Sequence, residues 1–281
     1  MALGGLWLAS CGPLPGERDW PDAAPPIWEI TDPETGHTGW LFGTVHALPR
    51  DLSWGTPLLD RTFQDAGVLV VEVENLEAPG GPTLIENLST TADQPPLLAR
   101  VDAADRPVVA ALMRDADMEE GDFADTETWA AALTLAGAVR LGDPRYGVDR
   151  ALIDSADELI GLEGFTVQII MFDRLSQQAQ SDLLANVARA HASGTDEAML
   201  EAWLTGDEAA LDALVNSAMT DSPELRAALL TDRNRAWSDT IARLIAEGRR
   251  PFVAVGAGHT VGRDGVGRML QARGFTVRRI Q

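Results

Sequence analysis

The sequence predicts an α/β fold with a small, mostly parallel central sheet and a large helical insertion between its strands. Apolar runs typical of buried strands stand near both ends of the chain, at 68–74 and 251–256. Between them, residues 165–247 have helical patterns throughout. The run at 251–256 is followed by a helix pattern and a further strand, an order that predicts a β–α–β unit with a right-handed parallel crossover.

The predicted domain begins with strands. The expected elements are, in order, a strand at 27–31, a strand at 37–41, a helix around 56–66 and a strand at 68–74. The first two strands flank a turn signal at 32–36 and therefore form a β-hairpin. Residues 75–96 contain Pro-Gly-Gly-Pro and Pro-Pro and are expected to be mostly loop.

The middle of the chain is predicted to be helical from about 97 to 141, most clearly at 128–141. Asp149 stands where the N-cap of a helix over 150–157 is expected, and that structural role alone would explain this residue. A short strand at 159–163 follows and ends in a carboxylate, Glu163.

A long amphipathic helix is predicted to begin with Ser222 as N-cap and Pro223 at the first helical position, and to end at Gly248. Its apolar stripe consists of Leu225, Leu229, Trp237, Ile241 and Leu244. Arg233 lies on this stripe, and a buried arginine requires an anionic partner. A structural ion pair is the simpler explanation, and a catalytic role stays open. The last expected elements are a strand at 251–256, a helix near 264–273 and a strand at 275–280.

Composition excludes several classes of protein. With 281 residues and 45% hydrophobic residues, the chain can bury a sizeable core. Its net charge of −21 argues against a nucleic-acid partner, since phosphate binding needs basic clusters. All 22 basic residues are arginine, which excludes a Schiff-base or Walker lysine. The single cysteine, Cys11, leaves no internal disulfide and no cysteine-based zinc site.

The first 26 residues are expected to be an apolar N-terminus and a tether, and residues 27–281 a single domain with a helical insertion at about 83–247. The sequence Leu8-Ala9-Ser10-Cys11 is similar to a bacterial lipobox, in which signal cleavage leaves the cysteine acylated. The apolar run is too short to span a bilayer, and a basic region before it is missing. We expect a lipoprotein of the cell envelope, facing the periplasm and attached to the membrane through acylated Cys11.

Two histidines follow buried strands in the same local pattern, Gly43-Thr44-Val45-His46 and Gly256-Ala257-Gly258-His259. Glycine allows a sharp turn or a close approach, and open α/β sheets bind ligands outside the carboxyl ends of their strands. Either histidine alone could simply be a polar residue at a strand end, but the repetition favours one shared site. The other two histidines, His37 and His191, are expected at the surface.

Acidic side chains stand at the ends of the other predicted strands. Glu72 and Glu74 share one face near the carboxyl end of the strand at 68–74, because side chains alternate along a strand. Glu163 ends its strand in the same way. Charged residues often mark where a strand leaves the core, but two carboxylates on one face at this end suggest a functional site.

Two histidines and a carboxylate at strand ends suit a divalent metal ion. We expect His46, Glu72 and His259 to bind manganese, cobalt or zinc, which would activate water for hydrolysis of a peptide or small molecule. A further carboxylate could serve as the general base. Glu163 and Arg233 complete the predicted catalytic set of His46, Glu72, Glu163, Arg233 and His259.

Other kinds of site are weighed against this one. A dinucleotide site is rejected because the third glycine, Gly262, comes one place late and no acidic ribose ligand follows. The sequence argues against a serine hydrolase because the chain has no Gly-x-Ser-x-Gly. Two alternatives stay open. One is a metal-free esterase in which His46 activates water and Glu72 or Glu74 orients it. The other is a non-enzymatic lipoprotein that binds haem or a small ligand.

The same stretches resemble the TraB/GumN family, which is related to the Tiki metalloproteases. The stretches that carry the resemblance, from about Ile27 to Gln281, are 40–49, 70–73, 147–149, 161–163, 230–237, 255–259 and 274–277. The resemblance implies an α/β fold shared with erythromycin-esterase-like and haem-binding ChaN-like proteins. It also implies two histidines, a glutamate and an arginine at one site, with Arg233 the best match for the arginine. The Tiki relatives favour a peptide substrate. Glu74 departs from the family pattern, where aspartate is commoner.

These expectations predict how the site residues should lie relative to one another. His46, Glu72 and His259 should face one cleft at the carboxyl ends of neighbouring strands, within roughly 6 Å of each other, as ligands of one ion would. Glu163 should lie at the same rim, and Arg233 should point toward the cleft or toward one of these carboxylates.

Overall fold

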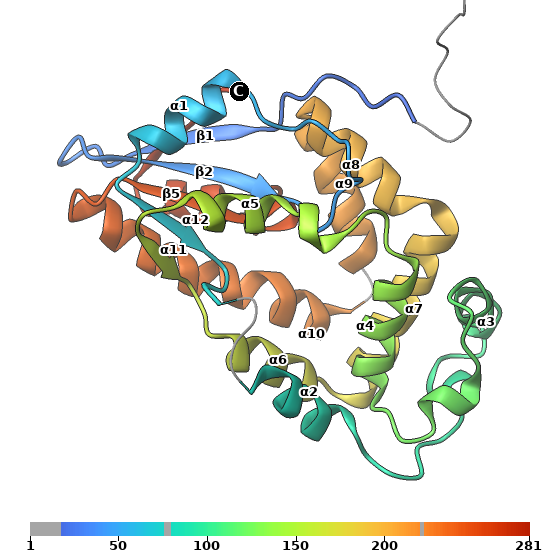
Figure 1. The fold of residues 1–281 in the computed structure, drawn as a ribbon. Coiled ribbons are helices and arrows are strands. Elements are labelled where there is room, and N and C mark those ends of the chain that lie inside the picture. Colours follow the sequence, from blue (N-terminus) through green and yellow to red (C-terminus); the bar gives the residue numbers. More distant parts are fainter. Residues whose placement is uncertain (1–17, 76–79, 220–221) are drawn as a thin grey trace, which may run out of the picture.

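A computed structural model describes residues 18–75, 80–219 and 222–281, with a six-stranded sheet at its centre (Figure 1). The strands lie in the order β4-β3-β5-β2-β1-β6. Strand β1 is antiparallel to both of its neighbours, and the other pairings are parallel. The predicted α/β class and mostly parallel sheet are therefore confirmed. The strands are β1 (Ile27–Thr31), β2 (Thr38–Thr44), β3 (Val68–Val71), β4 (Leu159–Gly161), β5 (Pro251–Gly256) and β6 (Thr276–Arg279).

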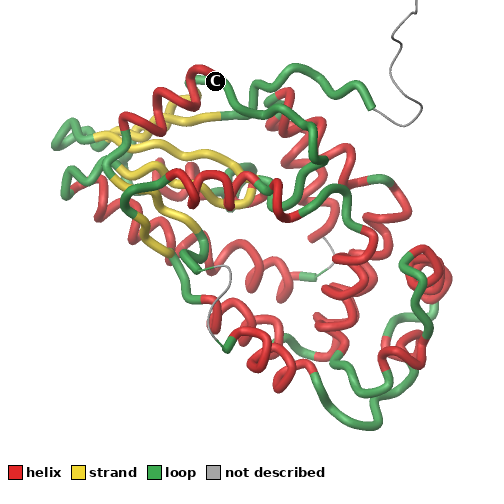
Figure 2. The backbone as a smooth tube through the Cα atoms, viewed as in Figure 1, coloured by secondary structure: helices red, strands yellow, loops and turns green. Residues whose placement is uncertain are grey.

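Helices fill most of the chain between β3 and β5, as Figure 2 shows in red. They are α2 (Gly81–Ser89), α3 (Arg106–Asp115), α4 (Thr128–Val139), α5 (Val148–Ser155), α6 (Phe165–Asp173), α7 (Gln177–Ser193), α8 (Thr195–Thr205), α9 (Glu208–Met219), α10 (Pro223–Arg226) and α11 (Asp232–Ala246). The short turns are η1 (Leu97–Arg100), η2 (Glu120–Phe123), η3 (Pro144–Tyr146), the π-helical turn η4 (Ala227–Thr231) and η5 (Ala257–His259). Helices α1 (Pro57–Asp65) and α12 (Val266–Ala272) lie outside this region.

The sheet is covered on both faces, which explains its continuous apolar strands. On one face, Phe42 and Phe252 pack in a cluster with Leu59 of α1, Val148 of α5 and Trp203 of α8. On the other face, the cluster is built from alternate strand residues and from α11 and α12. Every residue of β5 is buried, so this strand lies at the centre of the sheet, between the two layers of helices.

A second apolar core lies beyond the sheet. Its buried members come mainly from α3, α4 and α7, with Trp129 and Leu184 among the most deeply buried. The helices of this core stand beside the carboxyl ends of the parallel strands (Figure 1). They lie on the side of the sheet where the sequence places the site.

Three local expectations need correction. Residues 81–89 of the predicted loop form α2, because Pro82 stands in its first turn, where a missing N–H costs nothing. Strand β3 ends at Val71 rather than at Glu74. Strand β6 runs in the same direction as β5, but it lies at the edge of the sheet beside β1, with β2 and β1 between them.

The N-cap predicted for Asp149 is also wrong. Helix α5 begins at Val148 and its N-cap is Gly147, so the carboxylate of Asp149 is free for other contacts. Gly147 stands against the backbone of His46, where an added side-chain carbon would lie 2.3 Å from the carbonyl oxygen. The next backbone N–H, of Val148, donates to the carbonyl of Val45 at 2.9 Å. Helix α5 is thus fixed to the segment that carries His46.

We expect Gly147→Ala to lower the free energy of unfolding by about 1–3 kcal/mol, because the new methyl group overlaps the carbonyl of His46 and forces the backbone apart. Urea denaturation measures this change. Gly164→Ala is the control, since its added carbon meets nothing within 4 Å and its φ of −86° suits alanine. Equal stability of both variants would contradict the close contact.

Candidate functional site

The site lies where three adjacent parallel strands end. Glu72 directly follows β3, His46 stands two residues after β2, and His259 closes the η5 turn after β5. Glu163 stands two residues after β4, and its backbone N–H donates to the carbonyl of Glu72 at 2.9 Å. The five residues expected from the sequence, with Arg233 from α11 among them, are brought together here.

His46 is paired with Asp149, a residue to which the sequence gave only a capping role. The ring Nδ1 donates to Asp149 Oδ2 at 2.7 Å, and Thr44 Oγ1 donates to Asp149 Oδ1 at 2.6 Å. Both carboxylate oxygens are therefore used, and the imidazole is held with Nε2 free to face the cleft. The negative charge of Asp149 raises the pKa of His46 to about 9, and its hydrogen bond adds to the effect. The His46 side chain is 67% exposed, so water screens part of this attraction.

Glu72 is a buried carboxylate with a fixed partner on each oxygen. Its Oε1 accepts from the backbone N–H of Gly256 at 2.7 Å, and its Oε2 accepts from Arg233 Nη2 at 2.6 Å. Burial alone raises the pKa of this group. Nearby positive charge, from the His259 ring when protonated and from Arg233, lowers it by more than burial raises it, and the pKa is about 2. Glu72 is therefore an ionised acceptor throughout the physiological range.

Arg233 binds both site glutamates and uses all five of its N–H donors. Nε and Nη2 donate to the two oxygens of Glu163 at 3.1 and 2.5 Å, and Nη2 also donates to Glu72. Nη1 donates to the carbonyl of Leu229 at 3.2 Å and contacts His259 Nε2 at 3.3 Å. The guanidinium is only 13% exposed, so it works as a buried cation with two anionic partners.

The helix that carries Arg233 is irregular just before this residue. The η4 turn is π-helical over Ala227–Thr231, where an α-helix would otherwise run on from α10 into α11. A π-helical turn contains one residue more than an α-helical turn, and such turns are frequent at functional sites. Trp237, one turn further on, supports the arrangement, since its ring lies 4.6 Å from the Arg233 guanidinium and 4.5 Å from the His259 ring.

His259 is held in one tautomer by Asn234. The amide Nδ2 of Asn234 donates to the carbonyl of Asp264 at 2.7 Å, so its Oδ1 faces His259 and accepts from the ring Nδ1 at 2.6 Å. The Nε2 lone pair therefore points to Arg233, with Glu72 Oε1 3.8 Å away. Burial lowers the pKa of His259 to about 4, and the positive charges of Arg233 and His46 act in the same direction against Glu72.

The two histidines thus differ in protonation although their sequence patterns match. With a pKa of about 9, His46 is mostly protonated at neutral pH, whereas His259, with a pKa of about 4, is neutral. Neighbouring groups whose pKa values are pushed apart are typical of acid–base sites.

The remaining candidates lie outside the cluster. Glu74 is exposed, so it does not share the buried position of Glu72. His37 is exposed and bonds to the carbonyl of Ala246, and His191 pairs with Asp115 at the surface.

The three predicted metal ligands converge beside Gly256. A side-chain carbon on this glycine would lie 3.1 Å from Glu72 Oε1, 3.4 Å from His46 Nε2 and 3.6 Å from His259 Cδ2. Imidazole and carboxylate are suitable donors for a divalent ion. Among the described residues, however, no three His, Cys, Asp or Glu side chains are arranged to hold one. Arg233 binds Glu72 and faces the lone pair of His259, so the donors already surround a cation. In this arrangement the set does not fit a metal.

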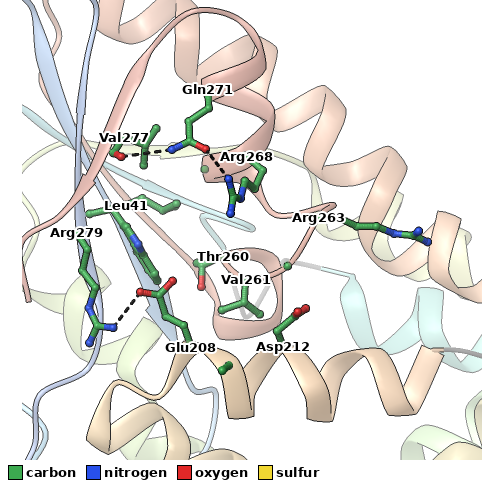
Figure 3. A pocket seen from close by; sticks show the side chains of 14 residues that line it. Leu41, Glu208, Asp212, Thr260, Val261, Arg263, Arg268, Gln271, Val277 and Arg279 are labelled. Atoms are coloured by element: carbon green, nitrogen blue, oxygen red, sulfur yellow. Dashed lines mark hydrogen bonds and ion pairs between the residues drawn. The ribbon is translucent and has the colours of Figure 1, made fainter.

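Two cavities meet at this cluster. One, of about 440 Å³, is lined mainly by apolar side chains of α8 and α9, and the other, of about 510 Å³, contains Glu72, Asp149 and Arg233. His46, His259 and Arg140 line both. A third cavity, of about 780 Å³, lies between α9, α12 and the edge of the sheet and contains none of the predicted site residues (Figure 3).

Fold and site together define an α/β protein with a histidine, glutamate and arginine cluster at the carboxyl ends of its strands. The model of the TraB/PrgY/gumN family matches residues 26–279, and the chain belongs to this family. No curated protein and no solved structure matches the chain.

Removing the Arg233 guanidinium should strongly destabilise the fold. We expect Arg233→Ala to lower the free energy of unfolding by about 3–5 kcal/mol at pH 7, because two carboxylates stay buried without their cation. The loss should shrink toward pH 5, where the unpaired carboxylates take up protons. Urea denaturation at both pH values measures it. Arg235→Ala is the matched control, since Arg235 is exposed on the same helix; a similar loss there would contradict the assignment.

The pairing of His46 with Asp149 predicts a titration that NMR can follow. The His46 ring should titrate near pH 9, and in Asp149→Asn its pKa should fall toward the ordinary value of about 6.5. Because the folded-state pKa is raised, the stabilisation from this pair is complete below about pH 6.5 and is lost as the pH rises through 9. A His46 pKa near 6.5 in the unchanged protein would contradict the ion pair.

Proposed function

We propose that this protein is a hydrolase in which His46, oriented by Asp149, activates a water molecule. The observation that carries the proposal is the 2.7 Å bond from His46 Nδ1 to Asp149, which leaves Nε2 facing the cleft beside Glu72 and His259. A carboxylate bound to Nδ1 fixes the tautomer in which Nε2 acts as a base and stabilises the imidazolium that forms.

Water is the nucleophile that the cleft favours. Among the described residues that line the two cavities there is no serine or cysteine, and the hydroxyl of Thr44 donates to Asp149. In the proposed reaction, neutral His46 takes a proton from water while the water oxygen attacks the substrate carbonyl. The imidazolium then gives this proton to the leaving group, which balances the reaction and restores the neutral ring.

The other members of the cluster would keep the backbone and the side chains of the site in position. Arg233 pairs with Glu72 and Glu163 and so connects the start of α11 to the segments that follow β3 and β4. His259, which is neutral and 7% exposed, provides a fixed wall opposite His46. This mechanism resembles the metal-free His/Glu esterase considered from the sequence, with one correction: the carboxylate that orients His46 is Asp149, and neither Glu72 nor Glu74 has this role.

A peptide is the substrate that the resemblance to Tiki proteases favours, and this part of the proposal rests on that resemblance. The dependence on manganese, cobalt or zinc stays a prediction from the sequence. It requires Arg233 to leave Glu72 and His259, since these two donors face its guanidinium. Metal analysis of protein purified without a histidine tag measures it directly.

Binding without turnover is the second candidate function. The apolar cavity beside the two histidines supports a small-ligand protein, and haem with one histidine as axial ligand belongs to the same class. A Soret band that appears on haem addition and is lost in His46→Ala or His259→Ala would favour this candidate.

Envelope attachment through acylated Cys11 also stays a proposal. Residues 1–17 lie outside the described part of the chain, and within that part no helix has the length and apolar character needed to cross a bilayer. The proposal rests on Leu8-Ala9-Ser10-Cys11. Mass spectrometry of the peptide that contains Cys11, from the membrane fraction of cells expressing the gene, would detect the lipid.

The pH profile of peptide or ester hydrolysis tests the mechanism. We expect kcat/KM to rise from pH 7 toward pH 9, because only the neutral form of His46 can accept a proton. His46→Ala should lower kcat/KM by about 10²–10⁴-fold. Asp149→Asn should lower it less and move the rising limb toward pH 6.5, close to the ordinary pKa of histidine.

Two controls keep this test specific. His191→Ala changes a surface histidine and should leave both rate and profile unchanged. Circular dichroism shows whether each variant is folded. A folded His46→Ala variant with full activity, or a rate that falls above pH 7, would refute the role of His46 as a base.

A further inference from the structure

The histidines stand between two cavities that differ in lining. The cavity of about 440 Å³ exposes mostly carbon, with Leu141, Met199, Leu200, Leu211, Leu214 and Val215 in its wall. The cavity of about 510 Å³ has a mixed lining, in which charged and amide side chains such as Arg140, Arg150 and Gln168 stand beside apolar ones such as Ile153 and Phe172. Both volumes lie in the range of small-molecule pockets, which is about 300–1,000 Å³. A bond placed at His46 would therefore have an apolar space on one side and, on the other, a mixed space that contains charged and amide groups.

The apolar cavity is kept open by the backbone next to His259. Gly258 lines it, and a side-chain carbon there would lie 3.4 Å from Val215 Cγ2, so any larger side chain at 258 would occupy the space. Leu214 and Val215 of α9 are only partly buried although they face this space. Partly exposed apolar side chains around a concave wall that reaches two histidines indicate a site for an apolar group.

The cavity of about 510 Å³ differs from the apolar cavity in the charged groups that line it. Arg140 borders both cavities, its side chain is exposed, and its Nη2 donates to the carbonyl of Gly137 at 3.3 Å. Glu72 and Glu163 are engaged by Arg233, and Asp149 is engaged by His46 and Thr44. The acids of this region are thus already paired, and Arg140 at the boundary suits an acceptor oxygen of a polar substrate group.

We propose that the substrate of this site is a peptide with a large aliphatic side chain on one side of the scissile bond and a polar residue on the other. The aliphatic side chain occupies the cavity between α8 and α9, and the polar residue lies beside Arg140 and Gln168. This inference rests on the proposed hydrolase function, because it names the substrate class of that same site.

Synthetic peptides of one polar sequence with a single variable position, occupied by leucine or alanine, test the specificity. After incubation with the full chain at pH 9, mass spectrometry gives the cleavage position and initial rates give kcat/KM. We expect cleavage next to the leucine and at least a tenfold lower kcat/KM for the alanine peptide, since about tenfold is the usual minimum for losing a methylene from an apolar pocket.

Two phenylalanine variants on α9 localise the effect. Val215→Phe fills the cavity next to Gly258 and should reduce kcat/KM for the leucine peptide at least as much as the change to alanine, while the alanine peptide is affected less. Ala213→Phe is the matched control, because Ala213 is exposed on the same helix and does not line the cavity. Equal kcat/KM for the two peptides, or an equal effect of both variants, would overturn the proposal.

A binding measurement separates this proposal from the proposed function. Calorimetry with the His46→Ala variant gives the Kd of the same two peptides without turnover. Tighter binding of the leucine peptide, lost in His46→Ala/Val215→Phe, supports the apolar site even if the unchanged protein cleaves neither peptide, in which case only the hydrolase proposal fails. Cleavage of both peptides at equal rates and with equal Kd supports hydrolysis and refutes the specificity.

Discussion

The buried ion pairs of Arg233 are the interaction on which the rest of the site depends. Strand β3 and the segment after β4 each bring a glutamate to the same end of the sheet, and two carboxylates so close and so little exposed could not both ionise unaided. The guanidinium, with five directed donors, satisfies Glu72 and Glu163 and also contacts His259. It thereby connects α11 to the strands and contributes to the lowered pKa values of Glu72 and His259.

The two Gly-x-x-His segments are alike in sequence and opposite in electrostatics. His46 lies beside an anion, Asp149, and gains basicity, whereas His259 is buried, beside a cation and under Trp237, and loses it. This difference comes from the charge of Asp149 at His46 and mainly from burial at His259. One local pattern therefore supplies two groups with different chemical roles.

Much of this arrangement could be predicted from sequence because it follows from strand order and periodicity. Apolar runs fixed the strands, and the rule that sites lie at strand carboxyl ends brought His46, Glu72 and His259 together. Asp149 and Asn234 were missed because a helix-start aspartate and a mid-helix asparagine each have an ordinary local explanation. Only their tertiary partners reveal them, although Asp149 lies in a stretch that resembles the family. The position of β6 beside β1 likewise depends on long-range pairing that no local pattern contains.

The π turn before Arg233 has a consequence for how relatives of this chain are compared. One extra residue in a helix rotates everything after it by about 100° relative to everything before it. A related helix that lacks the turn would direct a different side chain at the glutamates even if its flanking residues were identical, so an alignment drawn without a gap would equate residues that point in directions about 100° apart. Matching Arg233 across the family therefore requires a one-residue shift to be allowed between Ala227 and Asp232.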